Sequence, residues 1–190
     1  MTHNSFRISS GLFKGSKFKF PSSEELRPTK SFVKETLFNW LQFSITGSKV
    51  LDLFSGSGSL AFEAISKEAM SVTIVEKDKV AFDSLKKNSN NLKTTTSIQI
   101  INDDALNYIE RIKNTQFDIV FLDPPFFKNY LGPCLSRMEA NQVIGKKSKI
   151  YIESEFEITE DFLKKSLVLS FEIKKNKKSG DVYYSMVEIL

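Results

Sequence analysis

The segment Asp123-Pro124-Pro125-Phe126 combines residue types that suggest a binding site able to do chemistry. It directly follows the apolar run at residues 117–122, so we expect it to leave the carboxyl end of a buried parallel strand. The Asp123 carboxylate and a carbonyl fixed by the prolines can accept hydrogen bonds from an exocyclic amine, while the Phe126 ring stacks on a flat base. The segment therefore predicts a site for a planar ring that carries an amino group. The alternative is a strand-ending turn with a core phenylalanine.

A loop rich in glycine and serine, residues 52–59, follows an earlier strand-like run and opens a helix. Glycines let the backbone turn sharply and approach a ligand, and a helix start presents free N–H groups. Asp52 stands just before the loop, where its charge disfavours a pyrophosphate and favours an amine or a sulfonium. The spacing alone is also found in NAD-binding loops. The candidate ligand-binding residues here are Asp52, Phe54, Ser55, Gly56 and Gly58.

Acidic residues end the next two predicted strands. Glu76 stands where a carboxylate can hold both hydroxyls of a ribose. Asp104, beside Ala105, is placed to accept a hydrogen bond from the amino group of an adenine, and the choice between Asp103 and Asp104 stays open. Taken singly, each of these carboxylates could instead cap a helix or lie exposed on the surface. Together, at the ends of successive strands, they indicate a site for S-adenosylmethionine.

Strand and helix patterns alternate along most of the chain. Strand-like runs lie at residues 50–54, 72–76, 98–101, 117–122 and 149–152, with helical patterns at 59–67, 80–92, 105–112 and about 129–140. The last two runs, residues 167–173 and 182–189, are joined by a predicted turn at 177–180 and resemble an antiparallel hairpin. This alternation predicts an α/β class: a Rossmann-like, doubly wound, mostly parallel sheet with a C-terminal antiparallel hairpin.

Residues 1–45 are predicted to form an N-terminal extension packed on a main domain of residues 46–190. Residues 1–28 are expected to be extended or a hairpin, and residues 30–43 an amphipathic helix. The first twenty residues carry Arg7, Lys14 and two more lysines without an acid, and further lysines gather at 146–149 and 174–178. These groups fit contact with nucleic-acid phosphates, or lysines on solvated loops. Phenylalanines interleave the first group and were candidates for base stacking: Phe6, Phe13, Phe18 and Phe20.

The composition limits the class of protein. Hydrophobic residues make up 41% of the 190 residues, enough for a core, and the net charge of +4 favours a polyanionic or neutral partner. The single Cys134 excludes a disulfide framework within the chain, and the lone histidine, His3, offers it no base, so we expect a structural thiol. No apolar run approaches the ~20 residues of a membrane span, and the first residues lack a secretion signal. We expect a cytoplasmic monomer that needs no metal.

These motifs resemble the class I S-adenosylmethionine-dependent methyltransferases, of which Asp123-Pro124-Pro125-Phe126 is the amino-methyltransferase motif. The chain is more closely similar to the RsmD family of bacterial 16S ribosomal RNA (guanine-N2)-methyltransferases. The similarity extends over nearly the whole length, and its most family-specific part is the Arg-Pro-Thr segment with the helix after it. The stretches that carry it are RISSG at 7–11, LRPT at 26–29, VKETLFNWL at 33–41, LDLFSGSG at 51–58 and IYIESE at 150–155.

The resemblance implies methyl transfer from S-adenosylmethionine to guanine N2 in 16S ribosomal RNA, either free or in the small ribosomal subunit. It implies cofactor contacts by Asp52 and Gly56, ribose binding by Glu76 and an adenine contact near Asp104. Asp123 and Phe126 would hold the target base, and residues 27–29 would close over cofactor or substrate. The candidate substrate-binding residues are Arg7, Lys14, Arg27 and Thr29.

Three other interpretations use the same residues. An adenine-N6 or cytosine-N4 methyltransferase of DNA could use the same tetrapeptide, but the chain leaves no room for a separate sequence-reading domain. A catalytically silent RNA-binding module is disfavoured by Asp123 and Phe126 standing beside a complete cofactor loop. A dehydrogenase would need a pyrophosphate site and a hydride acceptor pocket, and it has no use for the tetrapeptide.

Overall fold

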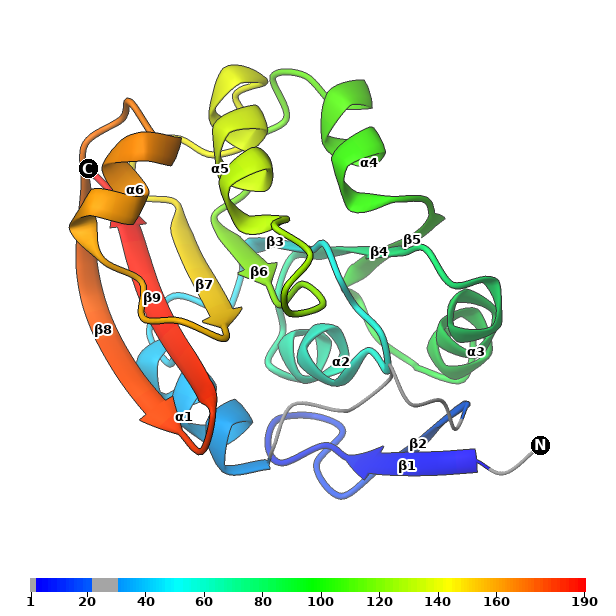
Figure 1. Cartoon of the computed structure of the whole chain (residues 1–190). Helices are drawn as coiled ribbons and strands as arrows, with labels where there is room; N and C mark the ends of the chain where they lie inside the picture. The colour runs from blue at the N-terminus through cyan, green and yellow to red at the C-terminus, as the bar shows by residue number, and fades with distance from the viewer. Residues whose placement is uncertain (1–2, 22–30) are drawn as a thin grey trace.

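A mixed sheet forms the centre of the computed structural model, which describes residues 3–21 and 31–190 (Figure 1). Its strand order is β5-β4-β3-β6-β7-β9-β8. The parallel strands are β3 (Lys49–Asp52), β4 (Ser71–Glu76), β5 (Ser97–Asn102), β6 (Ile119–Leu122) and β7 (Lys149–Ser154). The antiparallel hairpin of β8 (Phe171–Ser179) and β9 (Val182–Ile189) completes the sheet. The predicted doubly wound sheet with a C-terminal hairpin is confirmed.

Helices cover both faces of this sheet (Figure 1). On one face, α1 (Ser31–Trp40), α2 (Ser59–Ser66) and α3 (Lys79–Ser89) share a core with β3 and β4. On the other face, α4 (Ala105–Arg111), α5 (Leu131–Ala140) and α6 (Glu160–Ser166) pack on β6 and β7. Both faces of β3, β4, β6 and β7 are buried, which explains their apolar runs, whereas the edge strand β5 is partly exposed.

The N-terminal hairpin of β1 (His3–Arg7) and β2 (Lys17–Pro21) lies beside α2 and α3 (Figure 1). Phe6, Phe18 and Phe20 are buried in the core there, and the Phe18 ring stacks on Phe62 of α2 with centroids 4.8 Å apart. The predicted role of these three rings in base stacking was therefore wrong. Side chains alternate between the two faces of a strand, so the rings point inward while the lysines between them point to solvent.

The sequence patterns missed two features of the C-terminal half. Helix α6 was not predicted, although Thr159 caps it by accepting a hydrogen bond from the Phe162 amide at 3.3 Å. Strand β8 continues through Lys177, which was placed in a turn, because this lysine pairs with Tyr184 of β9. Across residues 3–21 and 31–190, no helix has the length and apolar character to cross a membrane.

Candidate active site

The carboxyl ends of the central strands bring the predicted acidic residues together. Asp52 ends β3, Glu76 ends the neighbouring β4, and Asp123 follows β6 on the opposite side of β3. The chain moves outward in opposite directions from β3 and β6, so this is the point where open α/β sheets bind ligands. The sheet topology thus places the glycine loop and the Asp123-Pro124-Pro125-Phe126 segment at one site.

Asp52 is 2% exposed, and the Ser55 hydroxyl donates a hydrogen bond to its Oδ2 atom at 2.9 Å. Burial, with a smaller contribution from the charge of Glu76, raises the pKa of Asp52 to about 7, and the Ser55 hydrogen bond only partly opposes this. A cation bound beside Asp52 would favour the ionised carboxylate. The role of Asp52 beside a positively charged ligand group therefore stays a prediction.

Glu76 organises the glycine loop around its carboxylate. Its Oε2 atom accepts a hydrogen bond from the Gly56 amide at 2.6 Å, and its Oε1 atom accepts one from the Asp78 amide at 2.7 Å. Burial raises the pKa of Glu76 even though these amide hydrogen bonds lower it. A carboxylate offers about four acceptor positions, so Glu76 can hold the loop and also accept hydrogen bonds from hydroxyl groups of a ligand.

Gly58 is required by the backbone conformation and by helix packing. Its φ is 81°, and a Cβ atom there would stand 2.4 Å from Leu85 of α3 and 2.7 Å from Phe62 of α2. Phe54, in the same loop, is half-buried and meets the Tyr130 ring edge-on, with centroids 5.2 Å apart. Both residues therefore have structural roles in the loop, and their contacts with a ligand stay predictions.

Asp103 and Asp104 both make contacts at the start of α4. Asp104 caps the helix by accepting a hydrogen bond from the Leu106 amide at 3.0 Å, as the alternative interpretation proposed. It also receives a hydrogen bond from the Tyr130 hydroxyl at 3.4 Å, which connects it to Phe54. Asp103 accepts from the Asp104 amide and forms an ion pair with Arg111. Ala105 is buried in the first turn. Tyr130 thus brings Asp104 to the side of the site formed by the glycine loop.

Asp123 lies half-buried after β6, with Pro124 buried, Pro125 exposed and Phe126 half-buried. Burial raises the pKa of Asp123 well above its usual range, and the charges of Glu153 and Asp52 raise it further. The influence of the Asp52 charge on this pKa shows that the two halves of the site are electrostatically connected. In its ionised form, a carboxylate with a raised pKa is a strong hydrogen-bond acceptor for an amine.

Glu153, at the end of β7, is an acidic neighbour of Asp123 that the sequence reasoning gave no role. The pairing of Leu122 with Ile152 brings the next residues of β6 and β7 side by side. Glu153 is buried and accepts a hydrogen bond from the Tyr151 hydroxyl at 2.8 Å. Its position at the carboxyl end of a predicted strand, like that of Glu76, was the signal that could have identified it.

The predicted substrate-binding residues are only partly placed by the structure. Arg7 is exposed at the end of β1 and donates a hydrogen bond to the Gly15 carbonyl at 3.2 Å. Lys14 is exposed in the loop between β1 and β2. Arg27 and Thr29 lie outside the described residues. Arg7 and Lys14 thus lie on one exposed part of the N-terminal hairpin.

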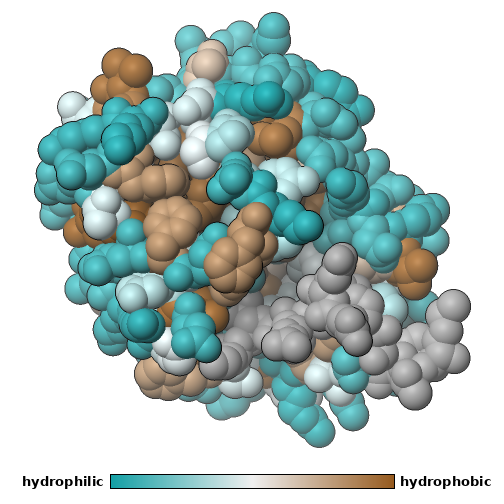
Figure 2. Space-filling model, viewed as in Figure 1, coloured by the Kyte–Doolittle hydropathy of each residue, from teal (hydrophilic) through white to brown (hydrophobic). Residues whose placement is uncertain are grey.

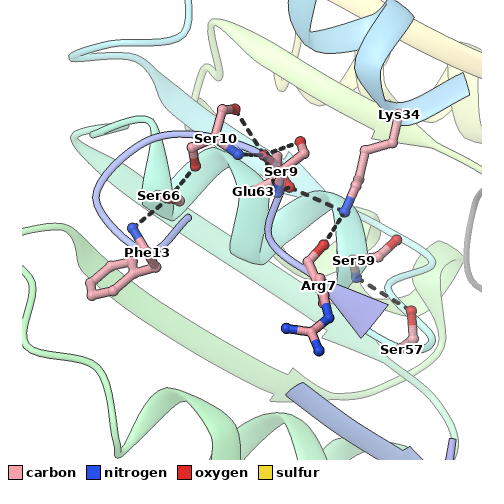
Figure 3. Close-up of polar contacts among 9 residues, drawn as sticks. All are labelled: Arg7, Ser9, Ser10, Phe13, Lys34, Ser57, Ser59, Glu63 and Ser66. Atoms are coloured by element: carbon pink, nitrogen blue, oxygen red, sulfur yellow. Dashed lines mark hydrogen bonds and ion pairs between the residues drawn. The ribbon is translucent and has the colours of Figure 1, made fainter. Parts of the chain in front are cut away.

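A buried network fastens this hairpin to α2, the helix that the glycine loop opens (Figure 3). The Glu63 carboxylate accepts hydrogen bonds from the amide and hydroxyl groups of Ser9 and Ser10, at 2.6–3.1 Å. Lys34 of α1 forms an ion pair with Glu63 at 3.1 Å and donates to the Arg7 carbonyl at 2.9 Å. The network therefore connects the hairpin, α1 and α2, and the sequence patterns did not predict it.

Within residues 3–21 and 31–190, the cysteine is structural and the acidic residues form no metal site. Cys134 is buried in the core, and burial raises the pKa of its thiol to about 12, in agreement with the predicted structural role. In the described part of the chain, no group of three or more His, Cys, Asp or Glu side chains is arranged to hold a metal ion.

Known proteins are similar to this chain over most of its length. The family profile described as Conserved hypothetical protein 95 matches residues 6–188. Ribosomal RNA small subunit methyltransferase D of Haemophilus influenzae is 40% identical over 186 residues, which cover 96% of this chain and 93% of that protein. The Escherichia coli K12 protein of the same name is 39% identical over 151 residues, 80% of this chain and 75% of that protein. The solved structure of yhhF from Escherichia coli superposes with a TM-score of 0.85 at 33% identity, over 98% of both chains.

Proposed function

Because the chain belongs to the RsmD family of S-adenosylmethionine-dependent methyltransferases, described as Conserved hypothetical protein 95, we propose that it methylates the N2 amine of a guanine in 16S ribosomal RNA. The observation that supports this most directly is the position of Asp123 near Asp52, at the carboxyl ends of the paired parallel strands β6 and β3. An acceptor for a base amine and an acceptor suited to a cation would then lie at the same edge of the sheet. The substrate is free 16S RNA or the small ribosomal subunit.

The residues at the ends of β3, β4 and β5 suit the chemical groups of S-adenosylmethionine. When bound, this cofactor supplies an electrophilic methyl group on its sulfonium. Glu76 would accept hydrogen bonds from the ribose hydroxyls, and the buried Asp52 would face the positive charge. Asp104, or Asp103 beside it, would accept from the adenine amino group. These carboxylates match the hydroxyl, amine and sulfonium groups of the ligand, and that match supports the assignment.

The loop after β6 would position the target base. Asp123 and the Pro124 carbonyl accept hydrogen bonds from the two hydrogens of N2, which directs the nitrogen lone pair toward the methyl donor. The Phe126 ring stacks on the base. Positioning and electrostatics fitted to the transition state would supply most of the rate. Once N2 carries the methyl group it gives up a proton, and Asp123 or water accepts it.

The target guanine must be available outside a regular helix. N2 lies in the minor groove of a duplex, so the base has to be flipped out or to lie in a loop. Arg7 and Lys14 on the N-terminal hairpin would contact the surrounding phosphates. The exposed lysines of β8 add a second basic surface: Lys174, Lys175, Lys177 and Lys178.

Replacing Asp123 with alanine tests this assignment. Transfer of label from S-adenosylmethionine to small ribosomal subunits should fall by at least about 10²-fold, the cost of losing one preorganised acceptor, while cofactor affinity measured by calorimetry stays within a few-fold. Asp161→Ala, which removes an exposed carboxylate from α6, is the matched control and should leave both quantities unchanged. A large loss of cofactor affinity in Asp123→Ala would place Asp123 in the cofactor site and contradict its proposed role.

A further inference from the structure

Phe127, the residue after the Asp123-Pro124-Pro125-Phe126 segment, is an aromatic side chain displayed to solvent. It is 81% exposed, and apolar side chains are visible over the loop that follows β6 (Figure 2). Its backbone φ is 60°, in the left-handed region that bulky residues rarely adopt. Strained residues of this kind persist when the surrounding structure holds them, and they gather at functional sites.

Two contacts place Phe127 relative to its neighbours: one by its backbone and one by its ring. The Phe127 amide donates a hydrogen bond to the Glu155 carboxylate, which follows β7, at 2.8 Å. The Phe126 and Phe127 rings are perpendicular, with an interplanar angle of 89° and centroids 6.5 Å apart. Phe126 is half-buried, whereas Phe127 points into solvent, so the loop presents two aromatic surfaces in different directions.

Flipping a guanine out of an RNA stack leaves its neighbour without a stacking partner. Unstacking costs a few kcal/mol, and proteins that separate stacked bases insert apolar side chains between them. An aromatic ring suits this gap because any base can stack on it. Phe127 follows Phe126, the ring assigned to the flipped base. It therefore stands near the place where an aromatic ring could replace the flipped guanine in the stack.

We propose that Phe127 stacks on the base flanking the target guanine, in the space that the flipped guanine leaves. This inference rests on the proposed methylation of a guanine in RNA and adds a residue that promotes extrusion of that base. Phe126 contacts the flipped base, and Phe127 contacts the RNA from which it came. Glu155 positions Phe127 by holding its amide in the strained conformation.

The test compares two versions of the substrate. Small subunits are reconstituted on 16S RNA in which the nucleotides flanking the methylated guanine are either intact or abasic. Phe127→Leu keeps an apolar side chain of similar bulk but removes the ring, and Phe127→Trp restores a larger one. Phe43→Ala removes a ring that is 94% exposed after α1 and serves as the matched control.

On intact RNA, Phe127→Leu should lower kcat/KM by about 5- to 150-fold, which corresponds to the ~1–3 kcal/mol of base–aromatic stacking. On abasic RNA, the kcat/KM of Phe127→Leu should equal that of the wild-type protein on the same RNA, because no flanking base remains to stack. Phe127→Trp and Phe43→Ala should match the wild type on both RNAs. Equal losses on both RNAs, or no loss on either, would overturn the inference. A wild-type protein that methylates neither RNA would instead refute the proposed function and the inference with it.

Discussion

Replacing Glu63 with glutamine should destabilise the protein strongly, because it leaves a lysine buried without its counter-charge. The side chains of Lys34 and Glu63 are 4% and 0% exposed, and their ion pair measures 3.1 Å (Figure 3). Removing one partner of a buried ion pair costs roughly 3–5 kcal/mol. Glutamine also has one acceptor oxygen in place of two, for the donors of Ser9 and Ser10. We therefore expect the free energy of unfolding to fall by about 3–5 kcal/mol.

A double-mutant cycle measured by urea unfolding separates charge from packing. Lys34→Met removes the buried ammonium, so the pair Lys34→Met with Glu63→Gln should be less destabilised than the sum of the single variants by at least ~1 kcal/mol. Burial opposes ionisation of Glu63, but the hydrogen bonds from Ser9 and the charge of Lys34 lower its pKa overall. The ionised Glu63 thus stabilises the fold above its usual pKa of 4.5, and this contribution is lost in more acidic solution. The double-mutant cycle is therefore measured near pH 7.

The control is Glu110→Gln, which breaks an exposed ion pair of 3.2 Å with Arg137. Exposed pairs contribute about 0–1 kcal/mol, so this variant should unfold nearly as the wild type does. A loss below about 1 kcal/mol in Glu63→Gln, or strict additivity with Lys34→Met, would refute the reasoning that the buried network holds the N-terminal hairpin on α2.

Three further predictions concern single residues. Burial raises the pKa of Asp52 from 3.8 to about 7, so its protonated form stabilises the fold below about pH 4 and that contribution is lost as the pH rises toward 7. Asparagine does not titrate, so the free energy of unfolding of Asp52→Asn relative to the wild type should rise by on the order of 4 kcal/mol between pH 4 and 7, measured by urea unfolding. A difference that does not change with pH would contradict the raised pKa. Gly58→Ala should lower the stability measured by thermal unfolding by ~2–4 kcal/mol, because of overpacking and the φ of 81°. Gly47→Ala is the control: its φ is 74° but no atom lies within 4 Å of a Cβ, so it should cost only ~1–2 kcal/mol. Equal costs would argue against tight packing at Gly58. Cys134, whose thiol has its pKa raised to about 12 by burial, should react with iodoacetamide at pH 8 only as fast as the protein unfolds, and rapid alkylation of the native protein would contradict this.

The sheet and the convergence of acidic residues were predictable because each depends on a local pattern. Apolar runs with an acid at the carboxyl end identified β3 and β4, and parallel strands necessarily bring Asp52 and Glu76 to one edge. Glu153 satisfies the same rule at the end of β7, so its place beside Asp123 was predictable in the same way. The direct roles in ligand binding assigned to these residues stay predictions.

Other features depend on tertiary contacts that no local pattern contains. Phe18 and Phe20 alternate with lysines, and only the docking of the hairpin on α2 decides whether such rings stack on bases or fill a core. Glu63 is the one acid of α2, and its partners come from residues more than twenty-five positions away. Lys177 resembles a turn residue by composition, but pairing with β9 makes it part of a strand.

The central claim is best tested by identifying the methylated nucleoside. Small ribosomal subunits from cells that lack this gene would be incubated with the purified protein and labelled S-adenosylmethionine, and the 16S RNA would then be digested to nucleosides. The account predicts label in N2-methylguanosine alone. Label in N6-methyladenosine would contradict the guanine assignment, and absence of label from 16S RNA, with the cofactor still bound, would contradict the proposed substrate.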